Sequence, residues 1–176
     1  MAELRPARFR ALSDPKYVTV HTDGACIGNP GPGGYGVVLK YRGHRRELSG
    51  GYRLTTNNRM EMLAAIVALE ALKESCRVAI HTDSQYLANA VEKGWARGWK
   101  ANGWRRNKRE KAFNPDLWER LLTLCDSHEV EFKWVRGHAG DIENERCDSL
   151  ATNAAQQSTL MVDEGYEASN RNNGLT

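Results

Sequence analysis

The sequence predicts an α/β fold, in which helices flank a mixed five-stranded sheet made of an antiparallel meander plus two parallel strands. Three β-rich segments follow one another closely within the first 55 residues. A long helical pattern separates them from a fourth apolar segment, and further helical patterns separate the fourth from a fifth. Short connections join antiparallel neighbours, whereas helical crossovers join parallel strands. The order of the patterns therefore predicts both parts of the sheet.

The first strand is "YVTVHTD", which alternates apolar and polar residues, is rich in β-branched side chains and ends at Asp23. The glycine- and proline-rich stretch "GACIGNPGPGG" that follows is expected to be neither helix nor strand. "YGVVLKYRG" and "HRRELSGGYRLT" are the next two strands. "TTNNRMEMLAAIVALEALKES" is predicted to be a helix, because Met60, Leu63, Ala64 and Val67 recur at helical spacing after Thr and Asn capping residues.

The second half of the chain supplies the parallel strands and the remaining helices. "RVAIHTD" is a short apolar strand that ends at Asp83, and Ser84 caps the helix that begins "SQYLANAVEK". "NPDLWERLLTLCDSH" is a helix with Asn114 as cap and Pro115 in its first position. "EVEFKWV" is the fifth strand, and the last helix is predicted from about Ile142 to Gln157.

The length of 176 residues is that of one domain with one hydrophobic core. We place this domain at residues 16–158. Residues 1–15 show no period and are expected to form a flexible arm, and the polar residues 159–176 a partly disordered tail. No apolar run approaches the roughly 18 residues of a membrane span, and the first residues lack the apolar segment of a secretion signal. A cytoplasmic protein with no membrane partner is expected.

Four acidic residues occupy positions that favour a shared site. Asp23 and Asp83 each end a strand, within the similar stretches "HTDGAC" and "HTDSQY". Glu61 falls in the first turns of the helix after the meander, and Asp148 lies on the last helix. In open α/β sheets, ligands bind beyond the carboxyl ends of the strands. Taken singly, each acid is better explained as a turn residue, a cap or part of a solvated helix face.

Four carboxylates can share a small site only if cations neutralise them. Oxygen ligands without cysteine or a histidine cluster select Mg²⁺, with Mn²⁺ as a substitute. Two such ions about 4 Å apart can cleave a phosphodiester, one by activating the attacking water and the other by stabilising the leaving oxygen. A two-metal nuclease site is therefore expected.

A basic, tryptophan-rich segment lies between residues 93 and 111. It holds eight basic residues and one glutamate, a local charge of +7 in a chain whose net charge is +3. Such a patch indicates a polyanionic partner. Trp95, Trp99 and Trp104 lie among the cations, where an aromatic face can pack on a sugar or a base. The alternative for Trp95 and Trp104 is that they anchor this segment to the core.

Four blocks of the chain are similar to those of bacterial type 1 ribonuclease H. They are "TDGACIGNPGPGGYG", "TTNNRMEMLAAIVALEAL", "TDSQYL" and "WVRGHAGDIENERCD", and the resemblance extends from Tyr17 to about Tyr166. It implies a ribonuclease H-like fold with a basic protrusion. It also implies a monomeric enzyme that cleaves the RNA strand of RNA–DNA hybrids and leaves 5′-phosphate and 3′-hydroxyl ends.

The resemblance also implies roles for individual residues. Asp23, Glu61, Asp83 and Asp148 would be the metal-binding tetrad, and His138, in a glycine-flanked loop, would assist proton transfer or product release. Asn29, Asn57 and Gln85 would contact the hybrid across its minor groove. Asn29 and Thr56 match a pocket for a DNA phosphate, in which Lys40 stands where the family usually has arginine. The basic protrusion would add the following contacts: Trp95, Trp99, Lys100, Trp104, Arg105 and Arg106.

Two other functions remain open at this point. One is a hybrid-binding module without catalysis, which four acids in one site argue against, because acids repel a polyanion unless a metal is bound. The other is a DNA-cutting recombinase or integrase of the same broad fold, which would lack the four blocks. Comparison of RNA–DNA and DNA–DNA substrates separates the second from a ribonuclease H.

Overall fold

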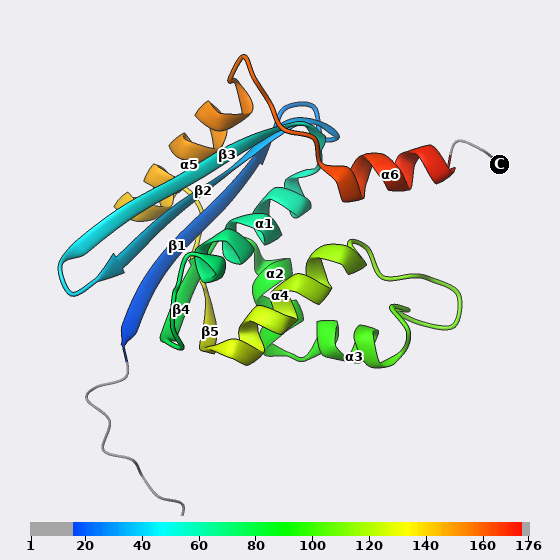
Figure 1. Cartoon of the computed structure of the whole chain (residues 1–176), viewed down its shortest axis with the longest axis horizontal. Coiled ribbons are helices and arrows are strands. Elements are labelled where there is room, and N and C mark those ends of the chain that lie inside the picture. The colour runs from blue at the N-terminus through cyan, green and yellow to red at the C-terminus, as the bar shows by residue number, and fades with distance from the viewer. Residues whose placement is uncertain (1–15, 174–176) are drawn as a thin grey trace, which may run out of the picture.

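The computed structural model describes residues 16–173 and confirms the predicted mixed sheet of five strands (Figure 1). In spatial order the strands are β3-β2-β1-β4-β5. The β1–β2 and β2–β3 pairs are antiparallel, whereas β1–β4 and β4–β5 are parallel. The strands are β1 (Tyr17–Cys26), β2 (Gly31–Tyr41), β3 (His44–Thr55), β4 (Arg77–Thr82) and β5 (Glu129–Trp134).

Helices cover both faces of the sheet. The helices are α1 (Asn57–Glu70), α2 (Gln85–Glu92), α3 (Trp95–Ala101), α4 (Pro115–Ser127), α5 (Ile142–Ala155) and α6 (Glu164–Asn173). Helix α5 packs on one face, against β1, β2 and β3, and α1 packs on the other, with α4 against it. Figure 1 shows α3 and the loop after it standing away from the sheet. Helix α3 lies inside the basic segment, where the sequence analysis assigned no element.

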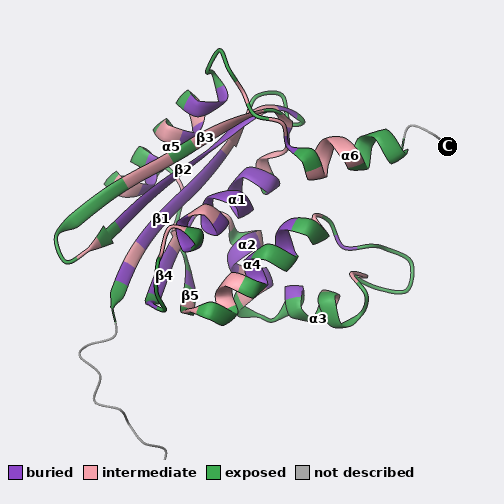
Figure 2. Ribbon diagram, viewed as in Figure 1, coloured by how far each residue is buried: buried purple, intermediate pink, exposed green. Residues whose placement is uncertain are grey.

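Helix α1 is the centre of the core. Ten of its fourteen residues are buried, so it has a polar end but no solvated face along its middle (Figure 2). Thr56 is its N-cap, as the sequence predicts, and the Thr56 hydroxyl accepts a hydrogen bond from the backbone N–H of Arg59. The cap fixes where the helix begins, and thus where Glu61 lies.

The glycine-rich stretch differs from the prediction. Strand β1 continues to Cys26 and β2 already begins at Gly31, so the loop is only residues 27–30. The glycines here serve close packing of helices on the strands. A Cβ atom at Gly24 would overlap the backbone of α1 at Glu61, and one at Gly34 would overlap the backbone of α5. Small residues are needed at such contacts. Because glycine is also typical of loops, the sequence pattern predicted a loop where the strands in fact continue.

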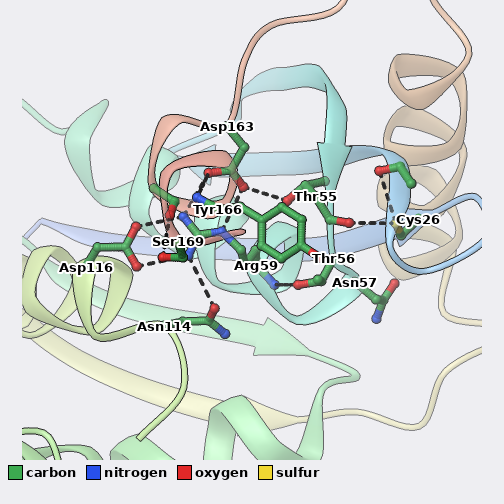
Figure 3. A network of polar contacts seen from close by, with 12 residues as sticks. Cys26, Thr55, Thr56, Asn57, Arg59, Asn114, Asp116, Asp163, Tyr166 and Ser169 are labelled. Carbon is green, nitrogen blue, oxygen red and sulfur yellow. Dashed lines mark hydrogen bonds and ion pairs between the residues drawn. The ribbon is translucent and has the colours of Figure 1, made fainter. Parts of the chain in front are cut away.

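The prediction of a partly disordered tail over 159–176 is wrong for residues 159–173. Met161 pairs with the β3 residue Tyr52, and α6 follows. The Asp163 carboxylate is buried, accepts hydrogen bonds from Arg59 and receives the Thr55 hydroxyl at 2.6 Å (Figure 3). The polar composition of this segment did not predict that it is ordered, because a single buried ion pair leaves no periodic pattern in the sequence. Residues 174–176 of the tail, like the predicted arm at 1–15, lie outside the described residues.

Arg59 connects three parts of the chain. Its guanidinium binds Asp163 before α6 and forms a paired contact with Asp116 of α4, at 2.9 and 2.7 Å. Asn114 precedes α4 as predicted, but its side chain makes no capping bond and instead accepts a 3.3 Å hydrogen bond from Arg59. The first turn of α1 is thereby tied to α4 and to the C-terminal segment.

Among residues 16–173, no helix has both the length and the apolar character that a membrane span requires.

Candidate active site

Three of the predicted carboxylates meet at one point. Asp23, Glu61 and Asp83 each present a ligand oxygen, and these oxygens lie within 4.8 Å of one another. Strands β1 and β4 run in parallel and in register up to the pair Thr22–Thr82, so the following residues, Asp23 and Asp83, emerge side by side. The repeated "HTD" sequence therefore places two acids at the same edge of the sheet.

The position of Asp83 is fixed by contacts from β5 and the loop after it. The indole N–H of Trp134 donates a hydrogen bond to the Asp83 carbonyl oxygen at 3.1 Å. A Cβ atom at Gly137 would lie 2.7 Å from an Asp83 carboxylate oxygen, so only a glycine lets the chain pass this close. Sequence reasoning missed this role of Trp134, which left no signal beyond its place at the end of a strand.

The close approach of the acids changes their protonation. Burial and the neighbouring Asp83 raise the pKa of Asp23 to about 7, although a hydrogen bond from the Gly24 N–H opposes this change. Burial, together with the charges of Asp23 and Asp83, raises the pKa of Glu61 well above its ordinary value. Desolvation and like charges both disfavour ionised carboxylates. The site thus concentrates negative charge that only a cation or a proton can compensate.

Asp148 and His138 join the same site. An open cavity of about 330 Å³ is lined by the three close acids, by Asp148 from α5 and by His138 from the loop before it. His138 has a φ of 56°, and its side chain is exposed. All five residues predicted for chemistry are therefore brought together. Ser84 also lines the cavity; the sequence analysis named it only as the cap of α2.

The donors suit a hard divalent cation. The close set offers carboxylate oxygens alone, which is the chemistry that Mg²⁺ and Mn²⁺ prefer. One oxygen of Glu61, Oε2, is buried and has no hydrogen-bond partner among the described residues. A buried, unpaired carboxylate oxygen is costly, and coordination of a cation would satisfy it.

Residues predicted to contact substrate lie around this cavity. Asn57 lines it, and the Asn57 N–H donates to the Asn29 side-chain oxygen at 3.0 Å, which links the 27–30 loop to the start of α1. Thr56 lies next to Asn57, with its hydroxyl engaged as the helix cap. Gln85 is exposed at the start of α2, two residues after Asp83.

Lys40 does not belong to this group, and its predicted place in a phosphate pocket with Asn29 and Thr56 is wrong. Within the β2–β3 ladder, Lys40 pairs with Arg45, whereas Gly31, nine residues earlier on β2, pairs with Thr55. Nine residues of strand span roughly 30 Å. The Lys40 ammonium instead lies 3.4 Å from the Glu143 carboxylate of α5. Sequence matching alone could not reveal that the two ends of β2 are so far apart.

The tryptophans of the basic segment have different surroundings. Trp95 is 41% exposed, and Lys93 lies over its ring at 5.5 Å. Trp99 is half-buried and packs edge-on against the fully buried Trp118 of α4. Trp104 is partly buried and also packs against the core. The alternative of a core anchor thus applies to Trp104 but not to Trp95, while Trp99 holds α3 in place.

The cations of this segment also fall into two groups. Arg97 and Lys100 form ion pairs with Asp126 and Glu119 of α4, at 2.6 and 2.9 Å. These pairs are exposed and therefore weak, so they can exchange for a phosphate. Arg106 lies over the Phe113 ring, and the Arg105 guanidinium donates to the backbone carbonyl of Lys108. Neither arginine forms an ion pair with an acid among residues 16–173.

Comparison with known proteins agrees with this geometry. The family model for RNase H matches residues 15–156. Ribonuclease H of Syntrophus aciditrophicus is 65% identical over 166 residues, which is 94% of this chain and 96% of that protein. Ribonuclease H of Desulforamulus reducens is 68% identical over 148 residues, 84% and 93% of the two chains.

A solved structure supports the same assignment. The crystal structure of LC9-RNase H1, described as a type 1 RNase H with the type 2 active-site motif, superimposes with a TM-score of 0.73. It is 34% identical in sequence, and the match covers 90% of this chain and 82% of that one. With a converging acidic site, a matching family model and relatives of this identity over nearly their whole length, the chain belongs to the ribonuclease H family, as a member of its bacterial type 1 branch.

Proposed function

We propose that this protein is a Mg²⁺-dependent endoribonuclease that hydrolyses the RNA strand of RNA–DNA hybrids and leaves 5′-phosphate and 3′-hydroxyl ends. The observation that carries the proposal is the convergence of Asp23, Glu61 and Asp83 within 4.8 Å, with Asp148 and His138 on the same cavity. High identity to proteins named ribonuclease H supports the choice of reaction. Two Mg²⁺ ions, or Mn²⁺ in their place, are the proposed cofactors.

In this proposal the four carboxylates hold the metal. The Asp23 carboxylate lies close to those of both Glu61 and Asp83 and would hold metal together with them, and Asp148 would add a ligand from α5. Divalent ions at such a site supply an activated water and stabilise charge on the leaving oxygen. The oxygen-only donors and the unpaired Glu61 oxygen support the assignment.

His138 is proposed to move protons at the edge of the cavity. Imidazole is the side-chain group best suited to proton transfer in catalysis, and the exposed position of His138 leaves it free to reach a substrate phosphate. Gly137 fits against Asp83 and so anchors the loop on the side toward the metal site. His138 can thus act close to the scissile bond without competing for metal.

Substrate recognition is proposed to use two surfaces. Asn29, Asn57 and Gln85 lie near the carboxylates, where polar groups can sense the 2′-hydroxyl that distinguishes RNA from DNA. The exposed cations and Trp95 of the basic segment would hold backbone phosphates and sugars farther away. The enzyme is proposed to act as a monomer, because one chain supplies the complete carboxylate set. Its proposed location is the cytoplasm.

A cleavage assay tests this proposal directly. End-labelled RNA would be presented single-stranded, paired with RNA and paired with DNA, and a labelled DNA–DNA duplex would be tested beside it. Each substrate would be given to the wild type and to Asp23→Asn, with Mg²⁺ or with EDTA. We expect cutting only of the RNA–DNA hybrid, and its loss both in EDTA and in the variant. Cutting of single-stranded RNA that persists in EDTA would refute the metal site, and cutting of DNA–DNA duplex would favour a DNA nuclease.

A further inference from the structure

Two stacked histidines lie on β1 and β4, two residues before the carboxylates of Asp23 and Asp83. His21 of β1 and His81 of β4 are in-register partners on parallel strands, and their rings stack with centroids 4.6 Å apart and planes 13° apart. Each histidine precedes an acid, Asp23 or Asp83, by two residues. Side chains two residues apart on a strand point to the same face, so His21 and Asp23 share the α5 face of the sheet. Asp83 follows His81 just beyond the end of β4.

The stack is closely packed between β1 and β4. His21 is 9% exposed, and the Val20 carbonyl oxygen lies 3.3 Å from Nδ1 of His81. A ring separation of 4.6 Å agrees with the roughly 4.8 Å between neighbouring strands, so the stack fills the space between β1 and β4 without spreading them. Nδ1 of His21 is buried without a hydrogen-bond partner among the described residues, so packing is the visible role of this ring.

The histidine stack lies at the last but one pair of the β1–β4 ladder, next to the residues that carry the carboxylates. The pairing of β1 with β4 ends at Thr22–Thr82, so Asp83 lies beyond the last paired residues. Its backbone is held from the β5 side by the Trp134 indole. On the β1 side, the last cross-strand contact on the same face is the histidine stack.

We propose that His21 and His81 are positioning residues, whose stacked rings set the separation of the Asp23 and Asp83 carboxylates and thereby the affinity of the site for divalent cations. This inference rests on the proposed metal site and goes beyond it, because neither histidine lines the cavity of the carboxylates. Removal of one ring leaves a gap below the acids, into which β1 and β4 can relax. The carboxylates would then lose the spacing that cations require.

Calorimetric titration of the free protein with MnCl₂ measures this role without using activity. We expect His21→Ala to weaken Mn²⁺ binding about tenfold, the lower end of what loss of a supporting residue costs a metal site. His21→Phe keeps a ring that can stack and should stay within about twofold of the wild type. Val18→Ala, on the same strand but in the core facing α1, is the matched control, which should lower thermal stability and leave Mn²⁺ affinity unchanged.

Three results would overturn the inference: wild-type affinity in His21→Ala, equal weakening in His21→Phe, or equal weakening in Val18→Ala. If His21→Ala does not fold, His81→Ala provides the same comparison at a less buried position. A wild type that binds Mn²⁺ but does not cleave hybrids would refute the proposed reaction and leave the positioning role measurable. A wild type that binds no Mn²⁺ would refute both.

Discussion

The buried ion pair between Arg59 and Asp163 should contribute strongly to the stability of the fold. The Asp163 carboxylate accepts from Nε and Nη2 of Arg59 at 2.7 and 2.9 Å, and the residues are 3% and 7% exposed. Asp163→Ala would leave a buried guanidinium with Asp116 as its remaining acid partner. Loss of one partner from a buried ion pair costs about 3–5 kcal/mol. Because Asp116 remains, we expect the lower end, about 3 kcal/mol.

Urea denaturation followed by circular dichroism measures this loss. With a typical urea dependence of about 2 kcal/mol per molar, the unfolding midpoint should fall by roughly 1.5 M. Glu167→Gln is the matched control on α6. The Glu167 carboxylate also accepts two hydrogen bonds from one arginine, Arg53, each at 2.8 Å, but this arginine is exposed. Exposed pairs contribute up to about 1 kcal/mol. A loss in Asp163→Ala no larger than that in Glu167→Gln would refute the reasoning.

Three further predictions concern the site and the basic segment. Asp83→Asn should abolish hybrid cleavage while binding measured by fluorescence anisotropy survives; Mg²⁺-dependent turnover above a few per cent would contradict the ligand assignment. Metal-free protein should lose stability as pH rises from about 4 to about 7, because the folded-state pKa of Asp23, about 7, lies above its ordinary 3.8 and the folded state binds the extra proton. Asp23→Asn should reduce this loss and leave the part due to Glu61, whose pKa is also raised. Unfolding midpoints in EDTA across that window will show the difference, and equal slopes in both proteins would exclude it. Neutralisation of four cations of the basic segment should raise KM for the hybrid and flatten the salt dependence of KM, with kcat little changed. These cations are Arg105, Arg106, Lys108 and Arg109. Neutralisation of the ion-paired Arg97 and Lys100 should have a smaller effect.

The sequence predicted the sheet and the acidic site well, because both depend on local patterns that survive in the fold. Strand periodicity and helical crossovers determine the pairing of β1 with β4, and this pairing places Asp23 and Asp83 at neighbouring positions. The position of Glu61 follows from the Thr56 cap. Features that depend on contacts between distant segments could not be predicted in this way. The Arg59–Asp163 pair, the Trp134 hydrogen bond and the separation of Lys40 from Thr56 all belong to this class.

The carboxylates of the active site and the cations of the basic segment lie on different parts of the fold. Such a separation is useful to a nuclease, which must attract a polyanion and also hold metal with acidic groups. A polyanionic substrate must approach a site at which burial and the neighbouring Asp83 carboxylate raise the pKa of Asp23 to about 7. Cations placed among these acids would neutralise them directly and weaken their hold on metal. Here the cations are carried on α3 and the following loop, which stand away from the sheet (Figure 1). Trp99, packed against Trp118, fixes α3 to α4, so the attraction for phosphate acts from a defined position while the carboxylates stay free to bind metal.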